Sequence, residues 1–421
     1  MDYRRRILDD RLDDLQPHLR ALAIFGPKAV GKTATAQRRA ASVVDLSKAP
    51  QRQIIALEEN VLTSLPGPVL IDEWQRLPEV WDAVKRAVDA GSPPGHFILA
   101  GSAAPRGAVV HSGAGRIVPV RMRPLSLAER DVETPTVSLG ALLNGNNEVA
   151  GRTRIRLADY VEEITGSGFP RIRSLPAVVR RAELDGYIDN VVQREFLDQG
   201  FQVRKPAILH DWMSAYAAAT ATTTAYSKIL DAATPGQSDK PAKATTMTYR
   251  DALASLWLLD PIPAWAPGRN HLDRLGQAPK HMLADPALSA RLLGLDASAL
   301  LRGDQGSRQL GEGAILGRLF EHLAALSVVS YAEAAEARVR HLRDQRGLHE
   351  VDLIVARPDG RVLAIEVKLA DHVDDQDVRH LHWLRQRIGD DLVDALVVNA
   401  GSDAYRRRDG IAIVPLALLG P

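Results

Sequence analysis

A short motif near the start of the chain restricts the fold more than any other feature. Residues 26–33 read Gly-Pro-Lys-Ala-Val-Gly-Lys-Thr and match the pattern G-x-x-x-x-G-K-[ST] in full. A continuous apolar run precedes the motif at Ala21–Phe25, and a helical stretch follows it at Thr33–Ser42. A buried strand, a glycine-bearing turn and a helix are the context in which this pattern holds phosphate. These flanks disfavour the alternative, a chance glycine-rich turn.

Each residue type in this loop suits the binding of a triphosphate. Consecutive backbone N–H groups and a helix N-terminus present partial positive charge to phosphate oxygens. Gly26 and Gly31 let the backbone turn close to the ligand. Lys32 is expected to reach the β- and γ-phosphates, and the Thr33 hydroxyl to coordinate Mg²⁺. The sequence therefore predicts ATP and Mg²⁺ as ligands of the whole loop: Gly26, Pro27, Lys28, Ala29, Val30, Gly31, Lys32 and Thr33.

A second apolar run, Pro68–Ile71, ends in two acidic residues, Asp72 and Glu73. Open α/β sheets bind their ligands at the carboxyl ends of parallel strands, so we expect Asp72 to help hold Mg²⁺. Glu73 is then placed to orient or deprotonate the attacking water. The alternative is that the two acids cap the next helix. Beside the phosphate loop, hydrolysis of ATP is the better prediction.

Two further polar residues are predicted to act in catalysis. Ser102 follows a third apolar run, Phe97–Ala100, at a point where a polar side chain can touch the γ-phosphate or its water. The alternative for Ser102 is a helix cap or a turn residue. Arg116, in a glycine-rich stretch, is a candidate arginine finger, although arginine is abundant here and most such residues are solvated.

The composition fits a soluble globular protein of several domains. At 421 residues the chain exceeds one ordinary domain, and 45% hydrophobic with 25% charged residues provide material for real cores. The net charge of +1 gives no general attraction to nucleic acid or membrane. Cysteine is absent, which excludes disulfides, thiolate nucleophiles and cysteine-bound zinc. We therefore expect a cytoplasmic protein without a signal peptide or a membrane span.

The spacing of apolar runs divides the chain further. Up to about residue 130, short apolar runs alternate with helical stretches, which predicts a parallel sheet covered by helices. Val132–Gly151 is rich in turn residues and is expected to be a loop or insertion. Short helices at Tyr226–Ala232 and Tyr249–Leu259 are compatible with a winged-helix module or with a plain helical connector, which we favour slightly. A long helix is predicted at Gly313–Leu326.

A predicted hairpin near the C-terminus carries a second group of charged residues. Residues 358–360, Pro-Asp-Gly, separate two apolar runs and form a turn signal. If these three residues form the loop, Asp352 lies opposite Glu366, and Glu350 lies opposite Lys368.

Opposed carboxylates in such a hairpin need solvent or a cation, because like charges directly across a strand pair destabilise it. Mg²⁺ suits the pair of Asp352 and Glu366. Lys368 could position or activate a water, or stabilise a pentacovalent phosphate. Glu321, on the predicted long helix, is a further candidate ligand. Spacing leaves an alternative equally open, a surface hairpin with a Glu350–Lys368 ion pair and two solvated acids.

The N-terminal third resembles the AAA+ ATPases of bacteria and archaea that are known only as ATP-binding proteins. Besides the phosphate loop, the resemblance is carried by Leu70–Gln75, Leu99–Ser102 and Arg123–Leu127, and by Gly168-Phe169-Pro170, which is similar to a Gly-x-Pro element in the helical lid of such proteins. The C-terminal part resembles a domain fused to them that has the PD-(D/E)XK nuclease-like fold. The segments that carry this likeness are Gly317–Glu321, Glu350–Asp352 and Ile365–Lys368.

The resemblance implies an α/β P-loop NTPase of the AAA+ kind with three further parts. It divides the chain into an ATPase core (1–133), a helical lid with an insertion (134–200), a helical or winged-helix-like connector (201–275) and an α/β nuclease-like domain (276–421). DNA, a partner protein and further copies of the chain in an oligomer are partners that it leaves open. A membrane is not expected.

Two functions follow from these expectations. The first is an ATPase coupled to a Mg²⁺-dependent nuclease or DNA-binding module that acts on nucleic acid, with ATP driving closure of the lid. The second is a nucleotide-dependent switch whose nuclease-like domain is a catalytically inactive interaction module. A P-loop kinase for a small molecule is less favoured, because Asp72 and Glu73 suit hydrolysis and no acceptor pocket is evident.

Overall fold

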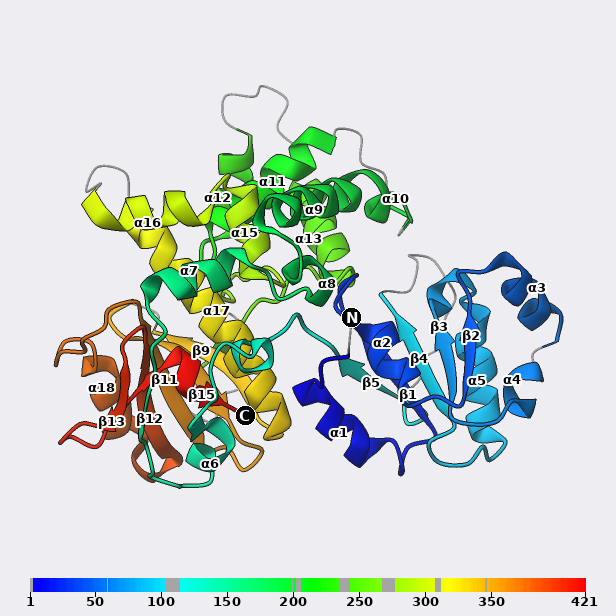
Figure 1. Ribbon diagram of the computed structural model, residues 1–421, viewed down its shortest axis with the longest axis horizontal. Coiled ribbons are helices and arrows are strands. Elements are labelled where there is room, and N and C mark those ends of the chain that lie inside the picture. The colour runs from blue at the N-terminus through cyan, green and yellow to red at the C-terminus, as the bar shows by residue number, and fades with distance from the viewer. Residues whose placement is uncertain are drawn as a thin grey trace.

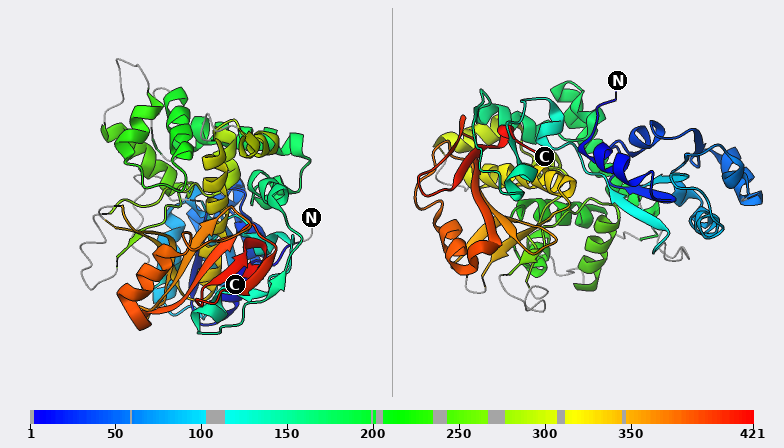
Figure 2. Two further views of the ribbon diagram at one scale, coloured as in Figure 1. Left: turned by 90° about the vertical axis from the view of Figure 1, so that its left-hand side faces the viewer. Right: turned by 90° about the horizontal axis from the view of Figure 1, so that it is seen from below.

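The computed structural model describes most of the chain, in three spatially distinct parts. The described residues are 3–58, 60–102, 114–198, 200–201, 206–234, 243–266, 277–306, 312–344 and 347–421. Figure 1 and the right-hand view of Figure 2 place an N-terminal sheet and a C-terminal sheet at opposite ends of the molecule. Helices from the middle of the chain pack beside both, and Figure 1 shows most of them above the C-terminal sheet and the centre of the molecule.

The N-terminal sheet is parallel, as the alternation of strands and helices predicts. Its described strands are β1 (Ala21–Phe25), β2 (Ser42–Asp45), β3 (Val69–Asp72), β4 (Phe97–Gly101) and β5 (Ile117–Arg121), in the order β2-β3-β4-β1-β5. Strand β4 therefore lies between β1 and β3, with Gly101 paired to Phe25 and Ala100 paired to Asp72. The carboxyl ends of all three strands consequently meet at one edge.

Both faces of this sheet are buried, which explains why its strands read as continuous apolar runs. One face, with Ala23 and Ile71, packs against α5 (Glu79–Asp89). The other face, with Leu22 and Ile98, belongs to a core shared with the helical part. The remaining N-terminal helices are α1 (Ile7–Leu15), α2 (Lys32–Gln37), α3 (Ala49–Leu57), α4 (Val61–Ser64), and the 3-10 helices η1 (Trp74–Arg76) and η2 (Leu127–Arg130). Helix α2 is shorter than predicted, because β2 already begins at Ser42.

The helical part runs from α7 to α16. Its described helices are α7 (Leu157–Thr165), α8 (Pro170–Arg173), α9 (Ala177–Asn190), the π-helix η3 (Val191–Glu195), α10 (Phe196–Asp198), α11 (Pro206–Ala218), α12 (Tyr226–Ala233), α13 (Lys243–Ser255), α15 (Pro286–Leu292) and α16 (Ala297–Gly306). After α13, Leu259 pairs with Leu283 and Ile262 with Lys280 in short antiparallel bridges. Helices followed by an antiparallel pair occur in winged-helix modules and in plain connectors, so both interpretations stay open.

The C-terminal sheet takes strands from three separate regions of the chain. Its strands are β7 (Gly151–Arg152), β8 (Ala264–Trp265), β9 (Arg338–Arg343), β10 (Glu350–Ala356), β11 (Val362–Lys368), β12 (Leu392–Asn399), β13 (Asp403–Arg406) and β14 (Ala412–Pro415), in the order β7-β13-β14-β12-β11-β10-β9-β8. Helix α17 (Glu312–Ala334) packs on one face and α18 (Arg379–Ile388) on the other.

The segment expected to be a loop or insertion beside the lid is in fact part of this C-terminal domain. Strand β6 (Val137–Ser138) pairs with β15 (Leu419–Gly420), and β7 pairs with β13. Between them, α6 (Leu139–Leu143) packs in the same core as α17. Strands of two residues are too short to show an alternating pattern, so no periodicity indicates this pairing.

Helix α17 connects the parts of the molecule. Its residues Ser327 and Tyr331 accept hydrogen bonds from the N–H groups of Leu127 and Ala128 at 3.0 Å. Within the described ranges, its stretch Ile315–Ala334 is long and apolar enough to cross a membrane by composition alone, but 72% of the most apolar window is buried inside the protein. That burial is typical of a core helix.

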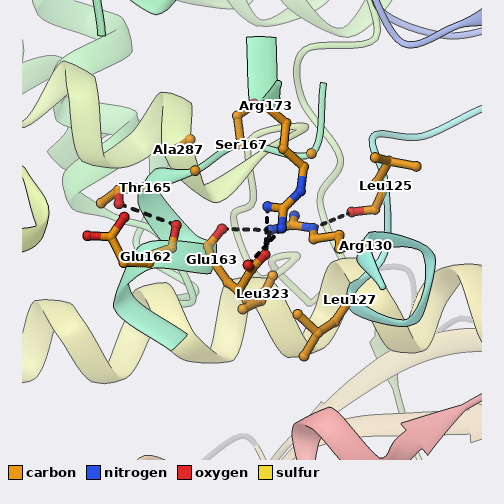
Figure 3. Close-up of polar contacts among 12 residues, drawn as sticks. Leu125, Leu127, Arg130, Glu162, Glu163, Thr165, Ser167, Arg173, Ala287 and Leu323 are labelled. Carbon is orange, nitrogen blue, oxygen red and sulfur yellow. Dashed lines mark hydrogen bonds and ion pairs between the residues drawn. The ribbon is translucent and has the colours of Figure 1, made fainter. Parts of the chain in front are cut away.

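A buried ion-pair network fixes the start of the helical part against the N-terminal part (Figure 3). Arg130 donates to the Glu163 carbonyl at 2.6 Å and to its carboxylate at 3.1 Å, and also to the Leu125 carbonyl at 3.0 Å. Arg173 adds two parallel bonds to the same carboxylate, both 2.7 Å. Although burial opposes it, Arg173 and Arg130 hold the pKa of Glu163 below its ordinary value. Nearby, Leu125 N–H donates to the Gly168 carbonyl at 2.7 Å, so two segments singled out in the sequence touch.

Replacing Arg130 should be costly to the fold. The side chain of Arg130 is fully buried, and Arg130→Met would leave Glu163 buried with fewer partners. We expect a loss of about 3 kcal/mol in the free energy of unfolding, measured by denaturant titration. Arg173→Met is the matched control, because Arg173 is 19% exposed and should cost about 1 kcal/mol. Equal losses in both variants would contradict this assignment.

Candidate functional site

The phosphate loop has the backbone shape that the motif predicts. Gly26 and Gly31 adopt φ values of +156° and +108°, and Ala29 between them is at +63°. A Cβ atom on Gly26 would lie 2.2 Å from the Met122 carbonyl oxygen, so only glycine fits there. Helix α2 begins at Lys32 directly after the loop.

The ammonium of Lys32 is folded back onto the loop. It donates to the carbonyl oxygens of Gly26 at 2.9 Å and Pro27 at 2.8 Å. Burial lowers the pKa of Lys32 to about 8, although the charges of Glu73 and Asp72 oppose this. The loop thus holds a cation that phosphate oxygens can draw away from weaker carbonyl partners.

The two predicted magnesium ligands of this site are in direct contact. The Thr33 hydroxyl donates to the Asp72 carboxylate, at 2.9 Å to one oxygen and 3.1 Å to the other. Burial raises the pKa of Asp72, and the neighbouring charge of Glu73 adds to this. A hydroxyl beside a carboxylate is a suitable donor set for Mg²⁺, so these residues fit the ion.

Glu73 is held in an unusual backbone conformation directly after β3. Its φ of 54° and ψ of 38° are left-handed, which is costly for a residue with a side chain. Gln75 donates to the Glu73 carboxylate at 2.6 Å and so orients it. The glycine at position 101, the last residue of β4, leaves room for this turn. A Cβ atom on Gly101 would clash with the side chains of Gln75, at 2.4 Å, and Trp74, at 2.6 Å. Gln75 thus supports Glu73, a role that its place in the sequence did not indicate.

Ser102 lies where the sequence predicts a phosphate-sensing residue. It follows β4, between the loop strand and the acidic strand, and is 3% exposed. Its hydroxyl has no hydrogen-bond partner within the described part of the chain. It lines a pocket of about 180 Å³ together with Lys28, Ala29, Tyr187, Asn190, Val191, Glu195, Leu256 and Leu258. The alternative of a helix cap or turn residue concerns residues 103–113, which lie outside the described part of the chain.

The helical part touches the phosphate loop at this pocket. Lys28 forms a close ion pair with Glu195, the last residue of the π-helix η3. The Tyr187 hydroxyl donates to the Lys28 carbonyl at 3.4 Å. Short π-helical segments are frequent at functional sites. Sequence reasoning missed Glu195 and Tyr187, because residues so far along the chain carry no local signal of this contact.

Arg116, predicted as an arginine finger, lies away from the site of its own chain. It directly precedes β5, whose first residue, Ile117, pairs with Ala21 at the start of β1. Arg116 is therefore at the amino edge of the sheet, whereas the loop follows Phe25 at the carboxyl edge. Its side chain donates to Asp89 at 2.6 Å and is 39% exposed. Within one chain, Arg116 cannot reach the nucleotide.

In the C-terminal domain, the hairpin has the predicted register. Leu353 pairs with Ile365, and Arg357 N–H donates to the Arg361 carbonyl at 2.9 Å. Asp352 continues this register beside Glu366, and its carboxylate accepts the Val367 N–H at 2.9 Å. Asp352 and Glu366 thus lie together, as the sequence predicts.

The surface-hairpin alternative is wrong. Strand β11 is central in the sheet, and Glu366 is 4% exposed. Burial and the charge of Asp352 raise the pKa of Glu366 well above its ordinary value. Lys368 approaches Glu366 at 3.7 Å rather than Glu350. Glu350 instead approaches Lys280 at 3.6 Å, so the expected Glu350–Lys368 pair is replaced.

Lys280 contacts three of the acidic residues in this cluster. Its ammonium lies 2.6 Å from Glu321, 3.0 Å from Asp352 and 3.6 Å from Glu350. Although burial favours the neutral amine, the charges of Asp352 and Glu321 raise the pKa of Lys280 above its ordinary value. Among the described residues, no three acidic or histidine side chains are arranged to share a metal ion. As folded, three of the acidic residues around the predicted Mg²⁺ site are paired with the ammonium of Lys280.

Three segments of the chain match models of known families. Residues 18–130 match a family described as AAA domain, and residues 157–299 and 316–419 match two domains of unknown function, DUF8612 and DUF4143. Uncharacterised proteins of Mycobacterium bovis and Mycobacterium tuberculosis are each 25% identical over 309 residues, which is 72% of this chain. The chain spans 62% of the length of these relatives.

Two solved structures of archaeal proteins show a distant likeness. The Walker-type ATPase of Pyrococcus abyssi aligns with a TM-score of 0.38 and 14% identity, over 69% of this chain and 96% of its own. The ORC2 protein of Aeropyrum pernix aligns with a TM-score of 0.30 and 15% identity, over 72% and 93%.

The loop, the acidic strand end and the parallel sheet together define a P-loop ATPase domain. Within that class, the match of residues 18–130 assigns this domain to the AAA type.

Proposed function

We propose that the chain is an ATP-driven switch, in which the nucleotide at residues 26–33 changes the contact between the loop and the helical part. The observation that carries this is the Lys28–Glu195 ion pair, which joins the phosphate loop directly to helix η3. A triphosphate in the loop offers Lys28 stronger anionic partners than one carboxylate. ATP would therefore compete with Glu195 and release this contact.

The residues of the site support hydrolysis in addition to binding. The ammonium of Lys32 would turn from the Gly26 and Pro27 carbonyls to the phosphates. Thr33 and Asp72 would hold Mg²⁺, which supplies positive charge to the phosphate oxygens when bound. Glu73, oriented by Gln75, would accept a proton from the water that attacks the γ-phosphorus. Cleavage of the bond from that phosphorus to the bridging oxygen gives ADP and phosphate.

Loss of the Lys28–Glu195 pair should strengthen the binding of ATP. In Glu195→Gln, Lys28 has no ion pair that must break before it can bind phosphate, so we expect KM for ATP to fall by about threefold. The effect is modest because the Lys28 side chain is 40% exposed. Phosphate release at varied ATP concentration measures this. Asp185→Asn is the control, since Asp185 on α9 pairs with Arg291 at the surface. An unchanged or raised KM in Glu195→Gln would argue against the switch.

A second candidate function is the cleavage of nucleic acid by the C-terminal domain, which would require Mg²⁺ to displace the Lys280 ammonium from Asp352 and Glu321. The observation that favours it is the meeting of Asp352 and Glu366 with Lys368 on β10 and β11. Incubation of the purified protein with DNA and Mg²⁺, with and without ATP, tests it. Cleavage that is lost in Asp352→Ala while ATP turnover persists would establish a nuclease. Absence of cleavage together with a co-purifying partner protein would favour an interaction module.

A further inference from the structure

We propose that the ammonium of Lys280 occupies the place of a divalent cation in the C-terminal carboxylate cluster and closes this cluster to metal ions. The inference concerns the carboxylate cluster and does not depend on the proposed switch. It explains why the acidic residues expected to bind Mg²⁺ come together without forming a site for it.

The contacts of Lys280 are those of a complete internal counter-ion. Its side chain is 1% exposed, and its three N–H donors face three carboxylates from two elements. Glu321 belongs to α17, whereas Glu350 and Asp352 belong to β10. A buried charge is tolerated only when paired, and here each partner lies within 4 Å. The cluster and the lysine therefore stabilise each other.

The backbone around Lys280 holds the side chain in this place. Lys280 and Ile262 exchange two N–H to carbonyl bonds, each 2.9 Å. Two residues before Ile262, Asp260 is bound by Arg121 at 2.8 Å and by Arg123 at 2.5 Å. The antiparallel pair that carries Lys280 is thus anchored to the end of β5. Lys280 is a fixed part of the structure and not a mobile surface lysine.

A second observation shows that the cluster would offer a further oxygen ligand once the Lys280 charge is removed. One carboxylate oxygen of Glu366 is buried and accepts no N–H group of a described residue, and the Glu366 carboxyl lies beside that of Asp352. Glu366 is 4% exposed, and its other oxygen lies 3.7 Å from Lys368. Unpaired buried carboxylate oxygens are costly unless a cation or a proton compensates them. Removal of the Lys280 charge would therefore leave oxygen ligands suited to a hard divalent ion.

The test is a direct count of bound metal, with Mn²⁺ as the probe and no nucleotide present. We expect Lys280→Met to bind about one Mn²⁺ per chain more than the unsubstituted protein, measured by electron paramagnetic resonance. The melting temperature of Lys280→Met should rise on addition of Mn²⁺ by more than that of the unsubstituted protein. The double variant Lys280→Met, Asp352→Asn should lose the extra ion. Any Mn²⁺ held by Thr33 and Asp72 is present in all samples and therefore does not change the difference in bound Mn²⁺ between them.

The variant Asp352→Asn in the otherwise unsubstituted chain makes the test independent of how Lys280→Met folds. We expect it to leave the number of bound Mn²⁺ ions unchanged, because Lys280 already fills the cluster. A loss of one ion in Asp352→Asn would overturn the proposal. So would a soluble Lys280→Met variant that gains none. If Lys280→Met folds only in the presence of Mn²⁺, this dependence supports the proposal. If Lys280→Met does not fold at all, the number of Mn²⁺ ions bound by Asp352→Asn tests the proposal by itself.

Discussion

The Lys32→Ala variant should lose ATP turnover by about 10²–10³-fold or more. Lys32 is the cation that lies inside the phosphate loop, held by the carbonyls of Gly26 and Pro27. Alanine leaves the backbone amides of the loop in place but removes the charge expected to reach the β- and γ-phosphates. Since that charge acts on the bound nucleotide and on the transition state, both affinity and turnover should fall. Phosphate release and fluorescent-nucleotide titration measure the two effects.

Two controls separate this loss from damage to the fold. Lys48→Ala removes an exposed lysine that pairs with Asp45 at 3.3 Å, and it should keep full activity. Circular dichroism of Lys32→Ala should match that of the unsubstituted protein, because Lys32 makes its two ammonium bonds only within its own loop. Retained turnover in a folded Lys32→Ala sample would refute the assignment of the nucleotide site.

The sequence predicts the geometry of the phosphate loop and of the acidic strand end well, because its determinants are local. The loop, its strand and its helix are consecutive, and the end of β3 carries Asp72 to the same edge of the sheet. The carboxyl ends of parallel strands lie at the same edge of a sheet, whatever the order of the strands. The contact of Thr33 and Asp72 therefore follows from the position of each residue after its strand. The hairpin register was likewise predictable, because a three-residue turn leaves few ways to pair the two strands.

What the sequence does not reveal are pairings between distant segments. Lys280 is 41 positions from Glu321 and 72 from Asp352, and Lys28 is 167 from Glu195. No periodicity or turn rule connects such residues. The acidic residues of β10 and β11 therefore predicted a metal site, whereas the lysine that pairs with them was indistinguishable from any other lysine of the chain. The position of Arg116 was unpredictable for a related reason, because a glycine-rich context does not indicate which edge of the sheet a residue will occupy.

The same distant pairings bear on how the two ends of the molecule are related. Strand β5 ends beside the loop, where Met122 N–H donates to the Phe25 carbonyl at 2.7 Å. Arg121 and Arg123, on either side of Met122, bind Asp260 in the antiparallel pair that carries Lys280. A few consecutive contacts therefore lead from the phosphate loop to the carboxylate cluster. The position of Lys280 is tied to the ATPase domain and not to the C-terminal sheet alone.

The Glu73→Gln variant should separate the binding of ATP from its hydrolysis. Glutamine has nearly the same shape, so the left-handed turn and the contact with Gln75 can persist. It cannot accept a proton from water, and we expect turnover to fall by about 10²–10⁴-fold. Affinity for ATP should remain within a few-fold of the unsubstituted protein, because Lys32, Thr33 and the loop amides are intact. This pattern differs from Lys32→Ala, which should lose both.

The control for Glu73→Gln is Glu79→Gln, which neutralises an exposed acid in the first turn of α5 a few residues later. It should leave turnover unchanged, so a loss confined to Glu73→Gln cannot be ascribed to the net charge of the segment. Single-turnover measurement of γ-phosphate release, with nucleotide binding followed in parallel, gives both quantities for each variant. If Glu73→Gln kept more than about a tenth of normal turnover, Glu73 would not be the base, since a positioned base contributes at least about a hundredfold. The strained turn after β3 would then serve to position Asp72 and not to activate water.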